Sequence, residues 1–141
     1  MTRSIRALLL LIAVALPVTA AEPPYRVIVH PRNEVSAVDR QFLSEAFLKK
    51  TTRWDSGEVI RPVDLGPDTP ARRRFSMDVL GRSVSAVKSY WQQNIFSGRG
   101  VPPPELANDG DVVRYVLTHE GALGYVSAST DVGTAKIVPV K

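Results

Sequence analysis

A basic glycine loop is the first segment of this chain whose residue types could bind an anion. It consists of Ser97, Gly98, Arg99 and Gly100. The backbone N–H groups of such a loop can point the same way and form a small anion-binding nest, here with the Arg99 side chain above them. A Gly-x-Gly sequence after a helix also serves as a plain reversal of the chain. Both interpretations stay open.

The segment Leu65–Ala71 is the second candidate for an anion site. Thr69 is placed to cap a helix whose first residue is Pro70. Free N–H groups and the helix dipole make such an N-terminus attractive to anions. The cap and the proline also occur where no ligand binds, so this arrangement needs no ligand to explain it.

Several neighbours of this segment oppose anion binding. Pro70 has no N–H to donate, and Asp64 and Asp68 repel an anion. Arg72 borders the helix face that Ala71 and the later apolar residues form, so its charge could compensate. Arg72 to Arg74 could equally be an ordinary solvated basic face.

A third polar loop, His30–Ser36, follows the first expected strand. It offers Arg32, Asn33 and Ser36 as hydrogen-bonding groups. The alternative is an ordinary turn that Pro31 stiffens. We retain Arg32 and Ser36 as candidate ligands.

Catalysis, metals and cofactors find no support in the sequence. The chain contains no Cys, and His30 and His119 lack ligand spacing to each other. Asp109 and Asp111 lack the glycine and the other oxygen ligands of an EF-hand loop. We expect a protein that is not an enzyme and that has no catalytic residue, metal site or cofactor.

Alternating strands and helices must position these loops. We expect four strands, at Tyr25–Val29, Val59–Asp64, Gly121–Val126 and Lys136–Val140. Between them we expect helices in four places: from Val38 to Phe47 with Ser36 or Asp39 as cap, from Pro70, from Ser83 to Gly98, and from a cap at Asp109 to Gly121. The alternation predicts an α/β fold, with a small mixed or parallel sheet flanked by helices. In such sheets the ligand lies beyond the carboxyl ends of the strands.

The helix after Ser83 has the clearest apolar stripe. Val84, Val87, Trp91 and Ile95 recur at helical spacing, so we expect Trp91 in the core. Trp54 follows a basic helix exit, and we expect it to contribute less to stability.

Three segments in order resemble one family. Phe96–Val126 reads FSGRGVPPPELANDGDVVRYVLTHEGALGYV, and it follows Val27–Phe47 and Val59–Phe75. Together they resemble the phosphate-type substrate-binding proteins of ABC transporters, over about Tyr25 to Pro139. The resemblance implies a domain like one lobe of a type II periplasmic binding protein. It also implies phosphate or another small oxyanion as ligand and a transporter as partner.

The sequence departs from this family at the phosphate loop. The relatives place an Arg there, followed shortly by Ser-Gly-Thr. Leu65, Thr69, Pro70 and Ala71 stand at about these positions. The resemblance therefore implies Thr69, Ala71 and Arg72 as candidate ligands. We therefore expect weak oxyanion binding at most. The alternative is a periplasmic interaction or regulatory module that was derived from one lobe, binds a partner protein and holds no tight small ligand.

The N-terminus predicts export. Arg3 and Arg6 precede an apolar run to Leu16, and Pro17 and small residues follow. We expect a signal peptide over residues 1–21, cleaved after Ala20 or Ala21, and a single domain over 22–141. With no Cys, the chain cannot carry a lipid anchor on cysteine.

The charge of the exported protein argues against nucleic acid as a partner. Loss of Arg3 and Arg6 lowers the formal net charge from +4 to +2. So small an excess gives no basis for binding nucleic acid. A free periplasmic protein is the prediction.

Overall fold

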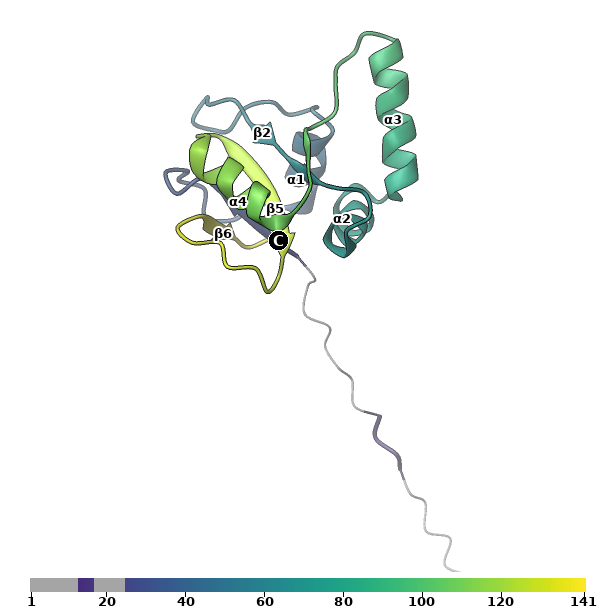
Figure 1. The fold of residues 1–141 in the computed structure, drawn as a ribbon, viewed down its shortest axis with the longest axis vertical. Helices are drawn as coiled ribbons and strands as arrows, with labels where there is room; N and C mark the ends of the chain where they lie inside the picture. The colour runs from purple at the N-terminus through teal and green to yellow at the C-terminus, as the bar shows by residue number, and fades with distance from the viewer. Residues whose placement is uncertain (1–12, 17–24) are drawn as a thin grey trace, which may run out of the picture.

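A four-stranded mixed sheet forms the centre of the molecule. The computed structural model describes residues 13–16 and 25–141 (Figure 1). The strand order is β2-β5-β1-β6, with bounds Arg61–Pro62, Ala122–Ser127, Tyr25–Val29 and Lys136–Val138. β2 runs parallel to β5, and β1 runs antiparallel to both of its neighbours, β5 and β6. The sheet is therefore mixed, and Pro139 follows the end of the edge strand β6.

The predicted strand Val59–Asp64 is wrong, because this segment changes its partner strand at Val63. The Val63 N–H still donates to the Leu123 carbonyl at 2.9 Å, whereas the next N–H, of Asp64, donates to the Pro104 carbonyl at 2.8 Å. The chain continues as β3 (Asp64–Leu65), which pairs in parallel with β4 (Glu105–Leu106) in a separate two-stranded sheet. Two short strands thus replace one long strand.

Helices precede or follow the strands as expected. They are α1 (Arg40–Phe47), α2 (Pro70–Phe75), α3 (Val84–Phe96) and α4 (Asp109–Thr118), and α2 continues directly into a π-helical turn, η1 (Ser76–Leu80). None of the helices among the described residues is long and apolar enough to cross a lipid bilayer. Apart from residues 13–16, which are exposed and lie in no helix or strand, the predicted signal peptide falls outside the described residues.

Side-chain caps fix where the helices begin. Thr69 and Ser83 cap α2 and α3 as predicted. Of the two candidates at α1, Asp39 is the cap, and its Oδ1 accepts from the Phe42 N–H at 2.6 Å. The predicted cap Asp109 is wrong, since Asn108 Oδ1 accepts the α4 bond from the Asp111 N–H at 2.9 Å. The carboxylate of Asp109 instead accepts from the Ser127 N–H and the Thr130 hydroxyl.

Both faces of the sheet are covered. On one face the Tyr125 ring stacks on Phe75 of α2 with centroids 3.9 Å apart, and Phe47 of α1 packs against both rings. On the other face α4 lies so close to β5 that a Cβ atom on Gly124 would stand 2.8 Å from a methyl carbon of Val112. Strong burial on both faces explains why β1 and β5 read as almost continuous apolar runs.

The helix α3 projects away from the sheet (Figure 1). Val87 and Trp91 of the predicted stripe are buried, at 1% and 6% exposure. The expectation that Ile95 continues the buried stripe is wrong, because 52% of it is exposed.

Trp54 is buried more deeply than expected. It is 7% exposed, and its Nε1–H donates to the Gly121 carbonyl at 2.9 Å. Its ring packs against Phe42 of α1 at 5.3 Å between centroids. Burial therefore gives no reason to expect that Trp91 contributes more to stability than Trp54.

Candidate functional site

The strand directions decide which candidate loops can meet. Since β2 and β5 are parallel, their carboxyl ends lie at the same end of the sheet. The segment Leu65–Ala71, which begins at the last residue of β3, lies at this end as well. β1 runs the opposite way, and its Tyr25 pairs with Ser127 at the end of β5. The loop His30–Ser36 therefore lies at the far end. Arg32 confirms this placement through an ion pair of 2.8 Å with Glu120, which precedes β5.

The segment Leu65–Ala71 is closed by its own hydrogen bonds. The Thr69 hydroxyl donates to the Gly66 carbonyl at 2.9 Å and accepts from the Arg72 N–H at 3.3 Å. Ala71 is only 2% exposed. Thr69 thus serves as the helix cap, and its hydroxyl hydrogen is already engaged within the loop.

Arg72 lies in the interior, and the alternative of a solvated basic face is wrong at this residue. Only 3% of Arg72 is exposed. Its Nη1 donates to the Leu65 carbonyl at 2.7 Å and to Glu105 at 3.3 Å, and its Nε lies 3.7 Å from an Asp64 oxygen. Two carboxylates therefore neutralise the charge that could have attracted an oxyanion.

Asp64 links this arginine to the core of the sheet. The Tyr125 hydroxyl donates to Asp64 Oδ1 at 2.7 Å. Burial raises the pKa of Asp64 to about 6, against the smaller lowering effects of Arg72 and of the Tyr125 hydrogen bond. Burial also raises the pKa of Tyr125, and the negative charge of Asp64 adds to this rise. At neutral pH Asp64 is thus mostly ionised, and its charge balances that of Arg72.

The glycine loop after α3 closes the helix. The N–H groups of Ser97, Gly98 and Arg99 donate to carbonyls of the last turn of α3, at 2.8 to 3.1 Å. Arg99 Nε donates to the Ser97 hydroxyl at 2.9 Å, and Gly98 has the left-handed φ of +69° expected of a closing residue. Three N–H groups of the predicted nest are therefore already engaged inside the chain.

The two predicted anion segments lie at opposite ends of α3. Val84 and Ser85, at its start, line a surface pocket together with Pro67 and Asp68. Ser97 follows its last residue. A helix of 13 residues is about 20 Å long, at about 1.5 Å per residue. The structure does not bring these two segments together.

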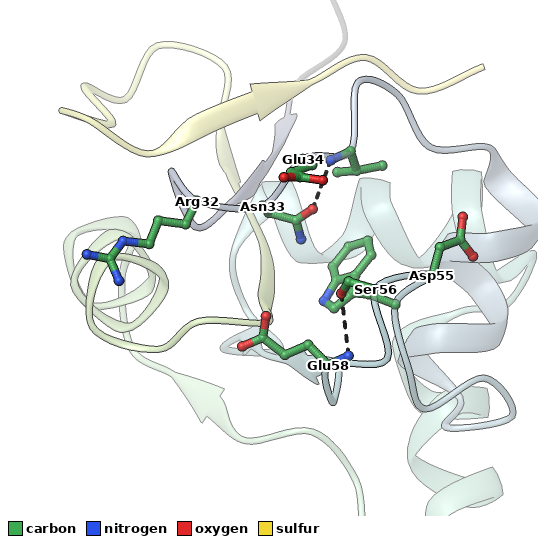
Figure 2. Close-up of a pocket in the computed structure, with 8 residues that line it drawn as sticks. Arg32, Asn33, Glu34, Asp55, Ser56 and Glu58 are labelled. Atoms are coloured by element: carbon green, nitrogen blue, oxygen red, sulfur yellow. Dashed lines mark hydrogen bonds between the residues drawn. The ribbon is translucent and has the colours of Figure 1, made fainter.

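A cavity beside Arg32, one of the predicted ligand-binding residues, lies at the other end of the sheet (Figure 2). It measures about 570 Å³, and its walls include Arg32, Asn33, Trp54 and the carboxylates of Glu34, Asp55 and Glu58. Figure 2 shows Arg32 directed away from Ser56 and Glu58. Ser36 is exposed and does not line this cavity. Three carboxylates and one arginine make these walls unsuited to an anion.

Sequence reasoning missed the buried group around Arg72, which we call the Arg72 network: Asp64, Arg72, Glu105 and Tyr125. The one available signal was Asp64, a charged residue at the end of an apolar strand pattern. Glu105 gave no signal, because it lies 33 residues from Arg72 in the sequence. Among the described residues, no cluster of His, Asp and Glu side chains is arranged to hold a metal ion.

Comparison with solved structures identifies the fold. The chain superposes on an ABC-type phosphate transport receptor from Vibrio cholerae with a TM-score of 0.64 and 16% identity, and on PstS from Borrelia burgdorferi with a TM-score of 0.57 and 13% identity. A Clostridium perfringens protein with bound phosphate, described as a phosphate ABC transporter substrate-binding protein, gives a TM-score of 0.64 at 19% identity. These matches cover 83 to 84% of this chain and 44 to 47% of the other chains.

The chain thus spans less than half the length of each of these binding proteins and has the fold of that part. No protein-family model matches the sequence, and no curated protein matches it either. The α/β sheet with flanking helices predicted from the sequence is confirmed, as is its likeness to one part of a phosphate-type binding protein.

Proposed function

We propose that this chain is a solute-binding-protein-like component associated with ABC-type transport of phosphate or a related small oxyanion. It acts mainly through a protein partner and holds the anion only weakly. The fold shared with phosphate-type binding proteins supports the first part. One observation carries the second part: Asp64 and Glu105 neutralise Arg72, the buried cation beside the α2 N-terminus.

Magnitudes agree with weak binding. Phosphate has five heavy atoms, so full enclosure at about 1.5 kcal/mol per atom would give roughly 7.5 kcal/mol, or micromolar affinity. An exposed helix N-terminus contributes only about 0.3 to 1 kcal/mol. Thr69 is engaged and Pro70 has no N–H, so we expect dissociation constants of hundreds of micromolar or weaker.

Titration with inorganic phosphate at low ionic strength tests this proposal. Asp68 is exposed beside the α2 N-terminus. Asp68→Asn should tighten phosphate binding roughly twofold to fivefold, because removing an exposed like charge changes binding by up to about 1 kcal/mol. Asp55→Asn, at the other end of the sheet, is the matched control and should change nothing. Submicromolar binding by the unmodified chain would overturn the proposal.

We also propose that the protein works in the periplasm, as a single domain over 22–141, after loss of residues 1–21. The Arg-flanked apolar run and the small residues before Glu22 support this. Intact mass of the protein recovered from the periplasm is the measurement. A mass that retains Met1 to Leu16 would contradict it. The same proposal gives the protein no catalytic role.

A second candidate function is an interaction module with no small ligand. It is favoured by large apolar side chains at the end of α3, where Ile95, Phe96 and Val101 are 52%, 96% and 60% exposed. Neighbouring exposed apolar groups of this size are typical of interaction surfaces. A photo-crosslinking residue at position 96, with position 89 on the same helix as control, discriminates the two functions. A defined adduct from position 96 alone, in a protein that binds no phosphate, would favour the module.

A further inference from the structure

A second cavity lies between α3 and the β3–β4 pair. Its volume of about 440 Å³ falls in the range of about 300 to 1,000 Å³ that small-molecule sites occupy. One wall is the apolar side of α3, including Val87 and Trp91, and the other wall carries Asp64, Arg72 and Glu105. An apolar wall facing a few polar groups is the usual composition of a ligand site.

The polar wall includes a hydrogen-bond donor that has no acceptor. Arg72 Nε is buried, and among the described residues it is the one buried side-chain nitrogen or oxygen without a hydrogen-bond partner. Its nearest carboxylate oxygen, on Asp64, is 3.7 Å away, beyond hydrogen-bond distance. Leaving a buried charged donor unsatisfied is unfavourable. Because Arg72 lines the cavity, a small shift of its side chain would expose Nε to an oxygen atom of a ligand, and that oxygen would relieve the cost.

The charges around the cavity determine the charge of the ligand. Asp64 and Glu105 are acidic, whereas Arg72 and Lys88 are basic. They balance, so neither an anion nor a cation gains a net attraction. An oxyanion would in addition face both carboxylates. A neutral ligand avoids the desolvation of a further charge beside Trp91.

We propose that this cavity binds a small neutral molecule with an apolar body and an amide or hydroxyl head. The body lies against Val87 and Trp91. The head accepts a hydrogen bond from Arg72 and donates one to Asp64 or Glu105. This ligand class differs from the oxyanion of the proposed function, and the two can be tested separately.

Benzamide is a suitable probe, since it is a neutral amide on an aromatic ring. Benzoate and benzamidine have nearly the same shape with a negative and a positive charge. In ¹H–¹⁵N spectra of the protein, benzamide should shift the indole signal of Trp91, with a dissociation constant of roughly 1 to 10 mM, as expected for so few atoms. Benzoate and benzamidine should bind at least threefold more weakly. The Trp54 indole lines a different cavity and should not move.

A pair of serine variants locates the binding. Ser85 is exposed and lines the cavity, whereas Ser89, one turn further on the same helix, is exposed and does not line it. Ser85→Phe should abolish the benzamide shift, and Ser89→Phe should leave it unchanged. The proposal is overturned if benzamide at roughly 20 mM, about twice the weakest expected dissociation constant, causes no shift of the Trp91 indole signal. Equal binding of the charged analogues, or equal loss in both variants, overturns it as well. Phosphate should not displace benzamide, whatever the outcome of the phosphate titration.

Discussion

In the central strands β1 and β5 nearly every side chain is buried, whereas of the 13 residues of α3 only Val87 and Trp91 are. We call the first region, with α1, α2 and α4, the sheet body, and residues 83–104 the α3 arm. The sheet body is held by stacked rings, by α4 packed directly on Gly124 and by the Arg72 network. The arm is held mainly by two apolar side chains over a cavity. Free energy of folding is therefore concentrated in the body, and surface available for binding is concentrated along the arm.

The two tryptophans give the strongest test of this difference. Replacing a buried Trp by Ala costs about 3 to 5 kcal/mol of unfolding free energy. Trp54→Ala should fall at the upper end, because it also removes one of the two hydrogen bonds that the buried Gly121 carbonyl accepts, the other coming from the Arg61 N–H. Trp91→Ala should cost less, because the arm can separate locally while the body stays folded. Urea melts of both variants are the measurement. A larger loss from Trp91→Ala would show that the arm is an integral part of the core.

The pH dependence of stability tests the Arg72 network. The folded pKa of Asp64, about 6, lies above its ordinary value of 3.8. Protonated Asp64 therefore favours the folded state at low pH, and this contribution is lost as the pH rises from about 4 to about 6. A difference of about two units between the folded and the unfolded pKa corresponds to about 3 kcal/mol of unfolding free energy.

Comparison with Asp64→Asn isolates that contribution. The unfolding free energy of the unmodified protein minus that of the variant should fall by roughly 2 to 3 kcal/mol between pH 4 and pH 7. Urea melts at one-unit pH intervals measure it. A difference that stays constant over this range would mean that burial does not raise this pKa.

The end of the arm should show the smallest effect on stability. Phe96 is 96% exposed, so Phe96→Ser should change the unfolding free energy by less than about 0.5 kcal/mol. The same change should reduce self-association or partner binding if the exposed apolar surface is used. Thermal melts combined with sedimentation analysis measure both effects. A loss of more than about 1 kcal/mol would place Phe96 in a contact with the body.

Local signals in the sequence predicted most of the elements. The apolar strand Tyr25–Val29, the caps Thr69 and Ser83 and the closing residue Gly98 were predicted correctly, because each depends on residues close by in the chain. The error at the second predicted strand arises from contacts between residues distant in sequence. Val59–Asp64 has a uniform strand composition, but which strands it pairs with depends on Leu123 and Pro104, which are distant in sequence.

The site was harder to predict for the same reason. Arg72 is basic by composition, and only its contacts with Asp64 and Glu105 remove it from the surface. The rule that ligands lie beyond strand ends placed His30–Ser36 beside the other loops, whereas the antiparallel direction of β1 places it at the far end. Periodicity could not show that Ile95, at the end of the apolar stripe, is 52% exposed. Strand direction and contacts between distant residues were the missing information.

The pairing of the first strand with the last has a consequence for protein engineering. Val27 of β1 lies opposite Val138 of β6 in an antiparallel pair, so the start of β1 and the end of β6 are neighbours at one end of the sheet. A domain whose two ends meet can be inserted into a surface loop of a host protein with short connections, without forcing the two sides of that loop apart. In such an insertion the α3 arm would project from the surface of the host protein. The connections to the host would be made at β1 and β6, the strands to which an ordinary terminal fusion is also attached.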